Sequence, residues 1–341
     1  MSRDEQLQAW VATQVAPRYP GADIGMAPAS ADASFRRYFR LTLADGSTRI
    51  LMDAPPDKED CRPFAHVAEL LAAAGIHAPK VELADFDQGF LLLTDLGRIG
   101  YLAALQAEPD LADVLMRPVL DVLVRWQCAS RPDVLPPYDA ALLRRELDLF
   151  PAWYIERHLG RSLSEAQRQT LAQSFTLLIE AALAQPRVFV HRDFMPRNLM
   201  VVESEAQLTP GVLDFQDAVY GPITYDVVSL FRDAFISWDE EQEIDWVVRY
   251  WEKARAAGLP VHADFGEFWQ AYEWMGLQRH LKVLGIFCRL KYRDGKAAYI
   301  ADLPRFLGYV RKVAGRYSAF KPLLVLLDAL EDKPLATGLT F

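Results

Sequence analysis

The sequence predicts an α+β protein with two lobes, a small N-terminal lobe with an antiparallel sheet and a large, mostly helical C-terminal lobe. The chain has 341 residues, which corresponds to two domains or lobes at about 100–200 residues per domain. Alternating strand patterns dominate the first part of the chain, whereas long helical patterns dominate the rest. We therefore expect one lobe over residues 1–96 and a second over residues 97–341, with a ligand cleft between them.

The composition limits the classes of function. Hydrophobic residues make up 51% of the chain and charged residues 24%, as in an ordinary globular protein rather than a disordered or collagenous one. The formal net charge of −9 argues against nucleic acid or an anionic membrane as a partner. Three cysteines without metal-binding spacing are typical of reduced thiols in a cytosolic protein. Because there is also no apolar signal or membrane-spanning segment, we expect a cytoplasmic protein with a small-molecule substrate and no obligate protein partner.

Six segments of the N-terminal lobe carry regular patterns. The strand-like segments are residues 38–43, 49–53, 80–84 and 89–94. The helical segments are residues 5–16 and 62–74. Ser2 and Glu5 have the pattern of a capping box at the first helix, and Gly75 has the position of a C-terminal cap at the second. The turn at Asp45-Gly46 is expected to join the first two strands into an antiparallel hairpin.

The C-terminal lobe is expected to be helical except for one short β-type stretch. Helical patterns cover residues 101–130 and 139–184, the β-type stretch covers residues 187–217, and helical patterns then continue to the C-terminus. Residues 274–290 are apolar on several sides, which predicts a largely buried helix.

The strongest chemical signal lies in the β-type stretch. Residues 191–198, HRDFMPRN, connect two apolar strands, and a third short strand leads into Asp214. Asp193, Asn198 and Asp214 are thereby expected to meet at strand ends. Phosphoryl transfer uses such a set: one carboxylate orients or deprotonates the attacking hydroxyl, and a second carboxylate with an amide oxygen holds Mg²⁺. A polar loop that only satisfies its own backbone does not account for two motifs in this order and spacing.

The pattern H-x-D-x-x-x-x-N followed by Asp-Phe resembles the kinase catalytic loop and metal-binding motif. The chain then continues with Gln216 and passes almost directly into Tyr220-Gly221-Pro222, so the activation segment of protein kinases is missing. The sequence therefore resembles the aminoglycoside phosphotransferase and choline-kinase superfamily, the small-molecule branch of the kinase fold. This resemblance implies a bilobal protein-kinase-like fold.

The superfamily resemblance also implies roles for individual residues. Asp193 is the expected catalytic base, and Asn198 and Asp214 are the expected Mg²⁺ ligands. His191 is expected to pack beneath the catalytic loop, and Asp226 is expected to accept backbone N–H bonds from that loop.

Four further segments resemble the bacterial anomeric N-acetylmuramate/N-acetylglucosamine kinases. They are residues 32–40, 51–56, 90–97 and 145–160. This resemblance, spread over most of residues 30–290, implies ATP-dependent phosphorylation of the C1 hydroxyl of an amino sugar in peptidoglycan recycling. It implies ATP and Mg²⁺ as cofactors.

The chain departs from the kinase pattern where the nucleotide phosphates would bind. The segment that would cover them has no glycine, so small residues such as Ser34 are expected to replace the usual glycine-rich loop. Met52 stands about where the strand lysine is expected. Another cation is then needed to neutralise the triphosphate, and the candidates are Arg36, Arg37 and Arg49.

Two more features of the nucleotide site follow from the resemblance. The hinge backbone is expected to hydrogen-bond adenine, at residues Leu93, Thr94, Asp95 and Leu96. Glu69 is the only acidic residue of the helix at 62–74. It is either the acid that pairs with the phosphate-binding cation or an exposed helix residue.

Two segments combine the side chains that sugar sites use. The first holds aromatic and hydrogen-bonding residues, although an ordinary amphipathic helix end has the same composition; they are Trp153, Tyr154 and Glu156. In the second, Arg279 lies on the buried helix and needs a partner for its charge. That partner is either a carboxylate such as Asp226 or the lactyl carboxylate of N-acetylmuramate, with His280 nearby.

Two rival functions stay open on the sequence alone. One is a kinase for another small hydroxyl compound, such as an aminoglycoside, choline or another sugar. The other is a catalytically inactive nucleotide-binding module, which the missing glycines and lysine favour and the joint presence of Asp193, Asn198 and Asp214 opposes. Magnesium-dependent ATP turnover distinguishes an enzyme from such a module.

Overall fold

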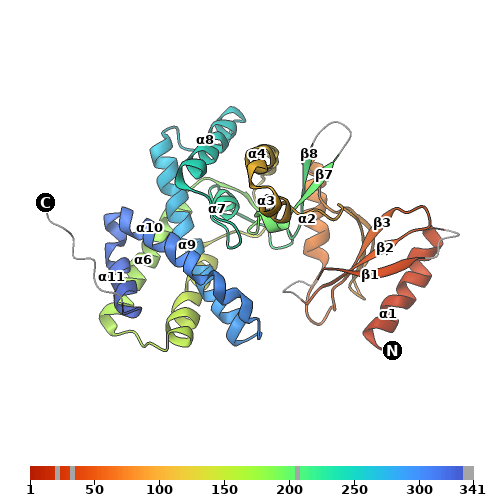
Figure 1. Cartoon of the computed structure of the whole chain (residues 1–341), viewed down its shortest axis with the longest axis horizontal. Helices are drawn as coiled ribbons and strands as arrows, with labels where there is room; N and C mark the ends of the chain where they lie inside the picture. The colour runs from red at the N-terminus through yellow and green to blue at the C-terminus, as the bar shows by residue number, and fades with distance from the viewer. Residues whose placement is uncertain (20–23, 31–34, 204–207, 333–341) are drawn as a thin grey trace. The chain divides into compact units, whose positions relative to one another are not determined.

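Two compact units make up the computed structural model of the chain (Figure 1). The described residues are 1–19, 24–30, 35–203 and 208–332. Unit 1 consists of residues 1–126 and 196–218, and unit 2 of residues 127–195 and 219–341. Unit 1 contains the whole predicted N-terminal lobe and adds the helices that follow it and the segment after the catalytic loop. The expected catalytic set is therefore divided, since Asp193 belongs to unit 2 whereas Asn198 and Asp214 belong to unit 1.

Unit 1 is built on a five-stranded antiparallel sheet with the strand order β1-β2-β3-β5-β4. The strands are β1 (Gly25–Ser30), β2 (Arg37–Thr42), β3 (Thr48–Asp53), β4 (Val81–Asp85) and β5 (Phe90–Thr94). The four strands expected from the alternating pattern are confirmed, including the hairpin of β2 and β3. The pattern does not reveal β1, an edge strand that contains Pro28, because proline lacks the N–H that a central strand needs.

The two faces of this sheet have different roles. The register places Arg40, Ile50 and Leu93 opposite one another on one face. Because side chains alternate along a strand, their neighbours Leu41 and Leu51 point to the other face. We call the first the cavity face and the second the α1 face. A charged side chain of this sheet can reach the cavity described below only if it lies on the cavity face.

Helix α1 (Arg3–Trp10) packs on the α1 face. Its predicted capping box is present, since Glu5 N–H donates to Ser2 Oγ at 3.3 Å and Ser2 N–H donates to Glu5 Oε2 at 2.7 Å. Leu7 and Trp10 are buried among sheet side chains. Two short turns then continue the chain, a π-helical turn (Val11–Val15) and a 3-10 turn (Ala16–Arg18).

The rest of unit 1 consists of helices and a two-stranded ribbon. The helices are α2 (Arg62–Ala73), α3 (Tyr101–Ala107) and α4 (Ala112–Cys128), and the ribbon strands are β7 (Leu199–Glu203) and β8 (Leu208–Val212). Helix α2 is followed as predicted by Gly75 with φ of 68°, a left-handed conformation that glycine adopts most easily. Val201 N–H donates to Ile99 C=O and Val212 N–H to His77 C=O, each at 2.8 Å, so the ribbon is hydrogen-bonded to the chain on both sides of β4 and β5.

Unit 2 is mostly helical. Its helices are α5 (Ala140–Leu147), α6 (Glu165–Ala184), α7 (Tyr225–Phe231), α8 (Glu240–Ala256), α9 (Phe265–Tyr292), α10 (Leu303–Arg316) and α11 (Lys321–Leu330), and its strands are β6 (Arg187–Val190) and β9 (Val219–Pro222). A π-helical segment (Phe150–His158) lies between α5 and α6. Helix α9 is the buried helix that the sequence predicts, with Leu277 and Leu281 fully buried. A Cβ at Gly285 would lie 2.4 Å from the backbone of Leu149, so this close approach requires glycine.

The three cysteines are free thiols, as predicted. Cys61 and Cys288 are buried and Cys128 is exposed. Burial raises the pKa of all three thiols, which favours the unreactive protonated form. Within the described ranges, no helix is both long and apolar enough to cross a bilayer.

Candidate active site

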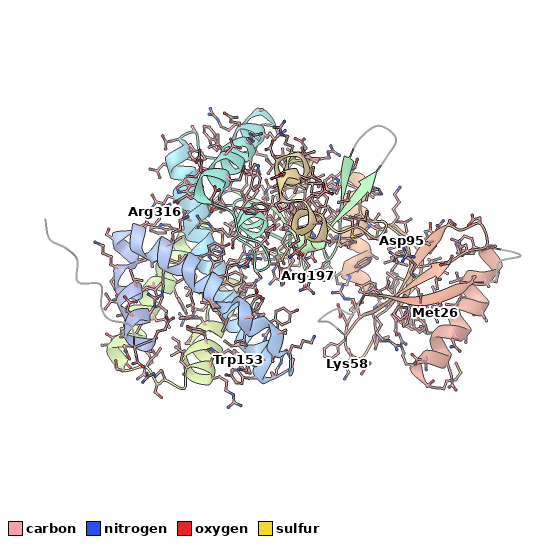
Figure 2. The ribbon with its side chains drawn as sticks, viewed as in Figure 1. Met26, Lys58, Asp95, Trp153, Arg197 and Arg316 are labelled. Atoms are coloured by element: carbon pink, nitrogen blue, oxygen red, sulfur yellow. The ribbon has the colours of Figure 1, made fainter. Side chains whose placement is uncertain are left out.

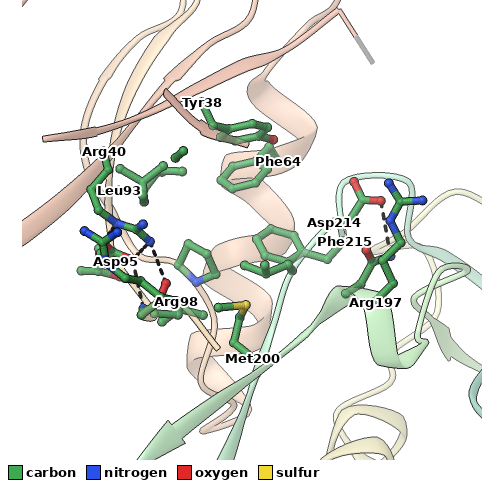
Figure 3. A pocket seen from close by; sticks show the side chains of 18 residues that line it. Tyr38, Arg40, Phe64, Leu93, Asp95, Arg98, Arg197, Met200, Asp214 and Phe215 are labelled. Atoms are coloured by element: carbon green, nitrogen blue, oxygen red, sulfur yellow. Dashed lines mark hydrogen bonds and ion pairs between the residues drawn. The ribbon is translucent and has the colours of Figure 1, made fainter. Parts of the chain in front are cut away.

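A cavity of about 520 Å³ lies in unit 1 and is lined by the cavity face of the sheet, the segment after β5 and the β7–β8 region. Its volume is within the usual range for small-molecule sites. Arg40 and Asp95 lie at one end of it, and Arg197 and Asp214 lie at the other (Figure 3). The predicted hinge residues 93–96 and both predicted metal ligands are among the lining residues. One cavity therefore brings together two parts of the predicted nucleotide site that are far apart in the sequence.

An ion pair fixes the hinge end of the cavity. Arg40 Nε donates to Asp95 Oδ2 at 2.5 Å, and Arg40 Nη2 donates to Asp95 Oδ1 at 3.0 Å and to Gly97 C=O at 2.7 Å. Gly97 N–H in turn donates to Asp95 Oδ1, and Gly97 has φ of 100°. Burial alone would raise the pKa of Asp95, but the bonds from Arg40 outweigh it and hold that pKa below its usual value. The carboxylate is therefore charged and the hinge turn is held in one conformation.

The predicted metal ligands meet at the other end of the cavity. Asn198 Nδ2 donates to Asp214 Oδ2 at 3.4 Å, and Leu213 N–H donates to Asn198 C=O at 2.9 Å. Asp214 has φ of 61°, and its side chain is 30% exposed. A carboxylate beside an amide suits Mg²⁺, which prefers oxygen ligands and keeps several of its waters or substrate phosphates. These donors therefore fit the metal that the motif implies.

The predicted catalytic loop begins in unit 2, where Asp226 holds its first residues, as the resemblance implies. His191 N–H donates to Asp226 Oδ2 at 2.7 Å and Arg192 N–H donates to Oδ1 at 3.0 Å. Burial raises the pKa of Asp226 to about 7, although both backbone bonds act in the opposite direction. His191 is also buried, and its Nδ1 accepts from Asp193 N–H at 3.2 Å. The backbone before and at Asp193 is thus fixed by groups of the same unit.

A buried ion-pair network holds the side chain of Arg192, which directly precedes Asp193. Glu146 of α5 accepts from Arg192 Nη2 and lies 2.8 Å from Lys282 Nζ of α9. The other oxygen of Glu146 accepts from the Tyr138 hydroxyl. Burial alone would raise the pKa of Glu146, but Lys282 and Arg192 outweigh it and lower the pKa to about 2. Sequence reasoning misses this network, and the signal that could have revealed it is a lysine on an otherwise buried helix.

The candidate phosphate-binding cations differ in their surroundings. Arg37 pairs with the fully buried Asp53 at 2.5 Å and with Asp4 at 2.7 Å. Arg49 pairs with Glu82 at 2.7 Å. Both arginines are engaged by acidic residues of the α1 face or its surroundings, so their charges are used within the protein.

Arg36 has a different position, immediately before β2. Its Nη2 lies 3.5 Å from Asp214 Oδ1, so it reaches a predicted metal ligand. Ser34, the predicted substitute for a phosphate-loop glycine, lies outside the described residues. Glu69 is exposed on α2, which supports the interpretation of it as an ordinary helix residue.

The predicted aromatic sugar segment lies in the π-helix of unit 2. Tyr154 is buried, its ring stacks on Phe150 with centroids 5.3 Å apart, and its hydroxyl donates to Glu331 Oε1 at 2.9 Å. Its ring and its hydroxyl are therefore both used within the core, which corrects its assignment as a sugar ligand. Trp153 packs against the same core and is half-buried (Figure 2). Glu156 is exposed. Within this segment, a sugar contact stays a prediction for Trp153 and Glu156.

Arg279 and Asp233 form a second polar region of unit 2. Arg279 is buried and donates from Nη2 to Ser229 Oγ at 2.9 Å. Among the described residues, its Nε and Nη1 and the Oδ2 of the fully buried Asp233 have no hydrogen-bond partner. Burial raises the pKa of Asp233 to about 6, and the nearby charge of Arg279 opposes that rise. The predicted neighbour His280 is fully buried and stacks on an aromatic ring of α10 with centroids 4.9 Å apart.

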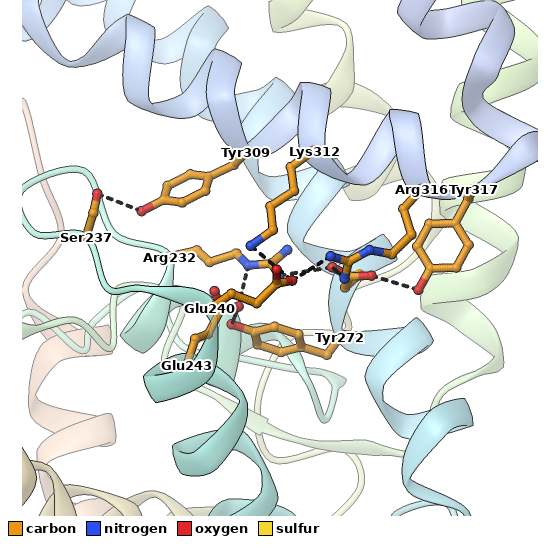
Figure 4. Close-up of polar contacts among 10 residues, drawn as sticks. Arg232, Ser237, Glu240, Glu243, Tyr272, Tyr309, Lys312, Arg316 and Tyr317 are labelled. Atoms are coloured by element: carbon orange, nitrogen blue, oxygen red, sulfur yellow. Dashed lines mark hydrogen bonds and ion pairs between the residues drawn. The ribbon is translucent and has the colours of Figure 1, made fainter. Parts of the chain in front are cut away.

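The adjacent Arg232 does not supply a counter-charge for Asp233. Arg232 Nε donates to Glu243 at 2.6 Å and Nη2 donates to Glu273 at 3.1 Å, and Arg316 pairs with Glu273 as well (Figure 4). Arg232 is thus neutralised within its own network. Sequence reasoning misses Asp233, and the signal that could have found it is a charged pair directly after Leu230 and Phe231 of α7.

Comparison with known proteins places the chain in a family. The model of the phosphotransferase enzyme family matches residues 25–265. The chain is 50% identical to the N-acetylmuramate/N-acetylglucosamine kinase of Neisseria meningitidis over 344 aligned residues, which cover all of both chains. It is 48% identical to the protein of the same name from Pseudomonas putida over 335 residues, which cover 96% of this chain and 97% of the relative.

Solved structures show the same fold at much lower identity. A choline/ethanolamine kinase family protein from Mesorhizobium loti has a TM-score of 0.59 at 12% identity, covering 96% of this chain and 100% of that one. The ternary complex of streptomycin, ATP and APH(2")-IIa has a TM-score of 0.58 at 13% identity, covering 89% and 97%. These similarities confirm the predicted bilobal kinase-like fold. The family match and the full-length identities show that the chain belongs to the phosphotransferase enzyme family and, within it, to the N-acetylmuramate/N-acetylglucosamine kinases.

Proposed function

We propose that the chain transfers the γ-phosphoryl group of ATP to the anomeric C1 hydroxyl of N-acetylmuramate and N-acetylglucosamine. The products are ADP and sugar 1-phosphates, which fits the reuse of cell-wall amino sugars. The observation that carries this function is the full-length identity of about half with kinases named for both sugars. We place the reaction in the cytoplasm, because the three cysteines are free thiols.

Asp193 is the proposed general base. It would accept a hydrogen bond from the C1 hydroxyl and take its proton late, because phosphoryl transfer passes through a loose transition state. Asp226 supports this role by holding the N–H groups of His191 and Arg192, so that the loop needs little reorganisation when the sugar binds. Proton transfer to a positioned base contributes roughly 10²–10⁴-fold to the rate.

Asn198 and Asp214 are the proposed ligands of Mg²⁺. When bound, the ion would supply positive charge to the β- and γ-phosphates of ATP. The contribution of the chain is to present a carboxylate and an amide side by side, joined by the backbone bond from Leu213 to Asn198. Partial exposure of Asp214 leaves its carboxylate accessible to such a ligand.

The nucleotide base is proposed to bind at the hinge end of the cavity. Backbone groups of residues 93–96 would hydrogen-bond adenine. The Arg40–Asp95 ion pair would keep this turn in the binding conformation before the nucleotide arrives, which reduces the entropy lost on binding.

The sugar is proposed to bind against Arg279 and Asp233. A sugar hydroxyl can donate to Asp233 Oδ2, and an acetamido or hydroxyl oxygen can accept from Arg279. Such contacts would satisfy the buried atoms of these two side chains that have no hydrogen-bond partner among the described residues. They involve only parts that the two sugars share, since the carboxylate of Asp233 would repel a lactyl carboxylate.

Phosphorus NMR of the purified protein with Mg²⁺-ATP and each sugar tests the proposed reaction. We expect a sugar 1-phosphate signal coupled to the anomeric proton, and no such signal with D193N. A phosphate monoester at another carbon would exclude the anomeric assignment. Absence of product with either sugar would refute the proposed function and lead to a panel of aminoglycosides, choline and other sugars.

A further inference from the structure

The strand position that carries the phosphate-binding lysine in protein kinases has no charge in this chain. Those kinases pair a lysine of the third strand with a glutamate of the following helix. Here Met52 of β3 lies opposite Tyr38, which lines the cavity, so Met52 belongs to the cavity face. Met52 is 0% exposed. The only lysines among the first 96 residues are exposed, and they are Lys58, which lies 3.3 Å from Asp57, and Lys80.

Strand geometry excludes two of the three arginines that could replace this lysine. Arg37 lies opposite Asp53, and Arg49 lies opposite Leu41. Both positions have the same parity as Leu51, so their side chains project to the α1 face rather than to the cavity. Their ion pairs with Asp53 and with Glu82 agree with this placement.

Arg36 is the last of these three arginines, and its contacts suit a side chain that binds phosphate. It lies between β1 and β2, the connection that covers the phosphates in kinases. Its Nε lies 2.9 Å from Glu59 Oε1, and its Nη2 lies 3.5 Å from Asp214 Oδ1. The Arg36 side chain is 6% exposed, whereas Glu59 and Asp214 are 25% and 30% exposed. A nearly buried cation therefore connects two accessible carboxylates, one of which lines the cavity.

We propose that Arg36 and Glu59 together replace the lysine–glutamate pair, with Arg36 as the side chain that binds the nucleotide phosphates. The planar guanidinium can keep Glu59 at Nε while its other nitrogens contact a phosphate oxygen, which a lysine ammonium cannot do in the same fixed geometry. Glu59 acts as a positioning residue, and it precedes α2, whereas Glu69 lies on α2 and is exposed. This inference rests on one part of the proposed function, the use of ATP, and is independent of which sugar is phosphorylated.

Nucleotide binding to the full-length protein, measured by calorimetry without sugar, tests this assignment. R36A is expected to weaken Mg²⁺-ATP and Mg²⁺-ADP by about 10- to 100-fold, the usual effect of losing a charge-assisted hydrogen bond. Binding of adenosine, which has no phosphate, is expected to change less than about twofold. R36K should recover part of the loss because it restores the charge without the fork. E59Q should weaken ATP in the same direction but less, because Arg36 keeps its charge and loses its anchor.

The matched control is R117A, which removes an exposed, ion-paired arginine of α4 and should leave all affinities unchanged. Equal losses for ATP and adenosine in R36A would show a purely structural role and overturn the proposal, as would an unchanged ATP affinity. If thermal unfolding shows that R36A is not folded, the same comparison of ATP with adenosine in R36K and E59Q tests the phosphate-binding role of Arg36. Failure of the wild-type protein to phosphorylate either sugar would refute the proposed function while leaving this nucleotide test intact.

Discussion

Glu146 provides a test of how the helical unit supports the predicted catalytic loop, since it contacts Arg192 directly before Asp193. The substitution E146Q keeps the shape of the side chain but removes the charge that holds Arg192 and Lys282. Two cations would then share a buried site without the carboxylate that contacts both of them. Arg192 has φ of 76°, a backbone conformation that most residues adopt only at a cost. We therefore expect both lower stability and a less ordered backbone at Asp193.

The size of the effect follows from the pKa of Glu146, which is lowered from 4.5 to about 2. Linkage converts this difference into about 3 kcal/mol of folding stability at neutral pH. Removal of one member of a buried ion pair costs about 3–5 kcal/mol in general, which is the same order. Because the pKa is lower in the folded state, the stabilisation is fully present above pH 4.5 and is lost as the pH falls toward 2.

Urea unfolding of wild type and E146Q at several pH values measures this contribution. At pH 7.5 we expect E146Q to lose about 3 kcal/mol, and at pH 3 we expect the difference to be about half as large. The control E252Q changes an exposed glutamate of α8 and should alter stability by less than about 0.5 kcal/mol. Turnover of E146Q should fall while ATP affinity, which we assign to unit 1, is unchanged. A loss below about 1 kcal/mol, or one that does not depend on pH, would refute the reasoning.

Four further substitutions separate the roles assigned above. D193N should lower kcat by roughly 10²–10⁴-fold and still bind Mg²⁺-ATP in calorimetry, and near-normal turnover would remove Asp193 as the base. D214A should weaken ATP binding in Mg²⁺ but not adenosine binding, and equal ATP affinity in both proteins would exclude it as a metal ligand. D95N should weaken adenosine and ATP alike by several-fold, because it releases the hinge turn that Arg40 holds; an effect on ATP alone would contradict this. Y154F should lose about 1 kcal/mol of stability in urea unfolding with an unchanged sugar KM, whereas a raised KM would return Tyr154 to the sugar site.

Local sequence patterns predict the elements that position the site wherever one physical signal dominates. The alternation in β2 and β3, the capping box of Ser2 and Glu5 and the left-handed glycine after α2 are each determined by a few neighbouring residues. The patterns fail where the signals conflict or the cause is remote. β1 contains Pro28, which opposes a strand assignment, and the π-helical segment 150–158 follows the close contact between Leu149 and Gly285 of another helix.

The residues of the site divide in the same way. Asp193, Asn198, Asp214 and Asp226 lie in one short stretch with recognisable spacing, and the structure gives Asp226 the backbone bonds that the resemblance implies. The residues that support them come from other parts of the chain and have no local pattern; they are Glu59, Glu146, Asp233 and Lys282. Each is an ordinary charged residue in the sequence. Its role is indicated only by its ion pairs in the structure or, for Asp233, by a buried oxygen without a hydrogen-bond partner among the described residues. Three-dimensional contacts are therefore needed to find the supporting residues of this site, but not its motif.

The two departures from the kinase pattern can be understood as a single change. In the sequence, the missing glycines and the missing lysine are independent losses that together favour an inactive protein. On our proposal, the connection before β2 contributes the side chain of Arg36 to the phosphates, so the strand behind it no longer needs a charge. Met52 can then be a buried apolar residue of β3, and the acid moves from α2 to Glu59, next to the relocated cation. Met52 in place of the lysine makes the sequence resemble an inactive kinase. The structure nevertheless keeps a cation, Arg36, in contact with an acidic partner, Glu59, and with Asp214.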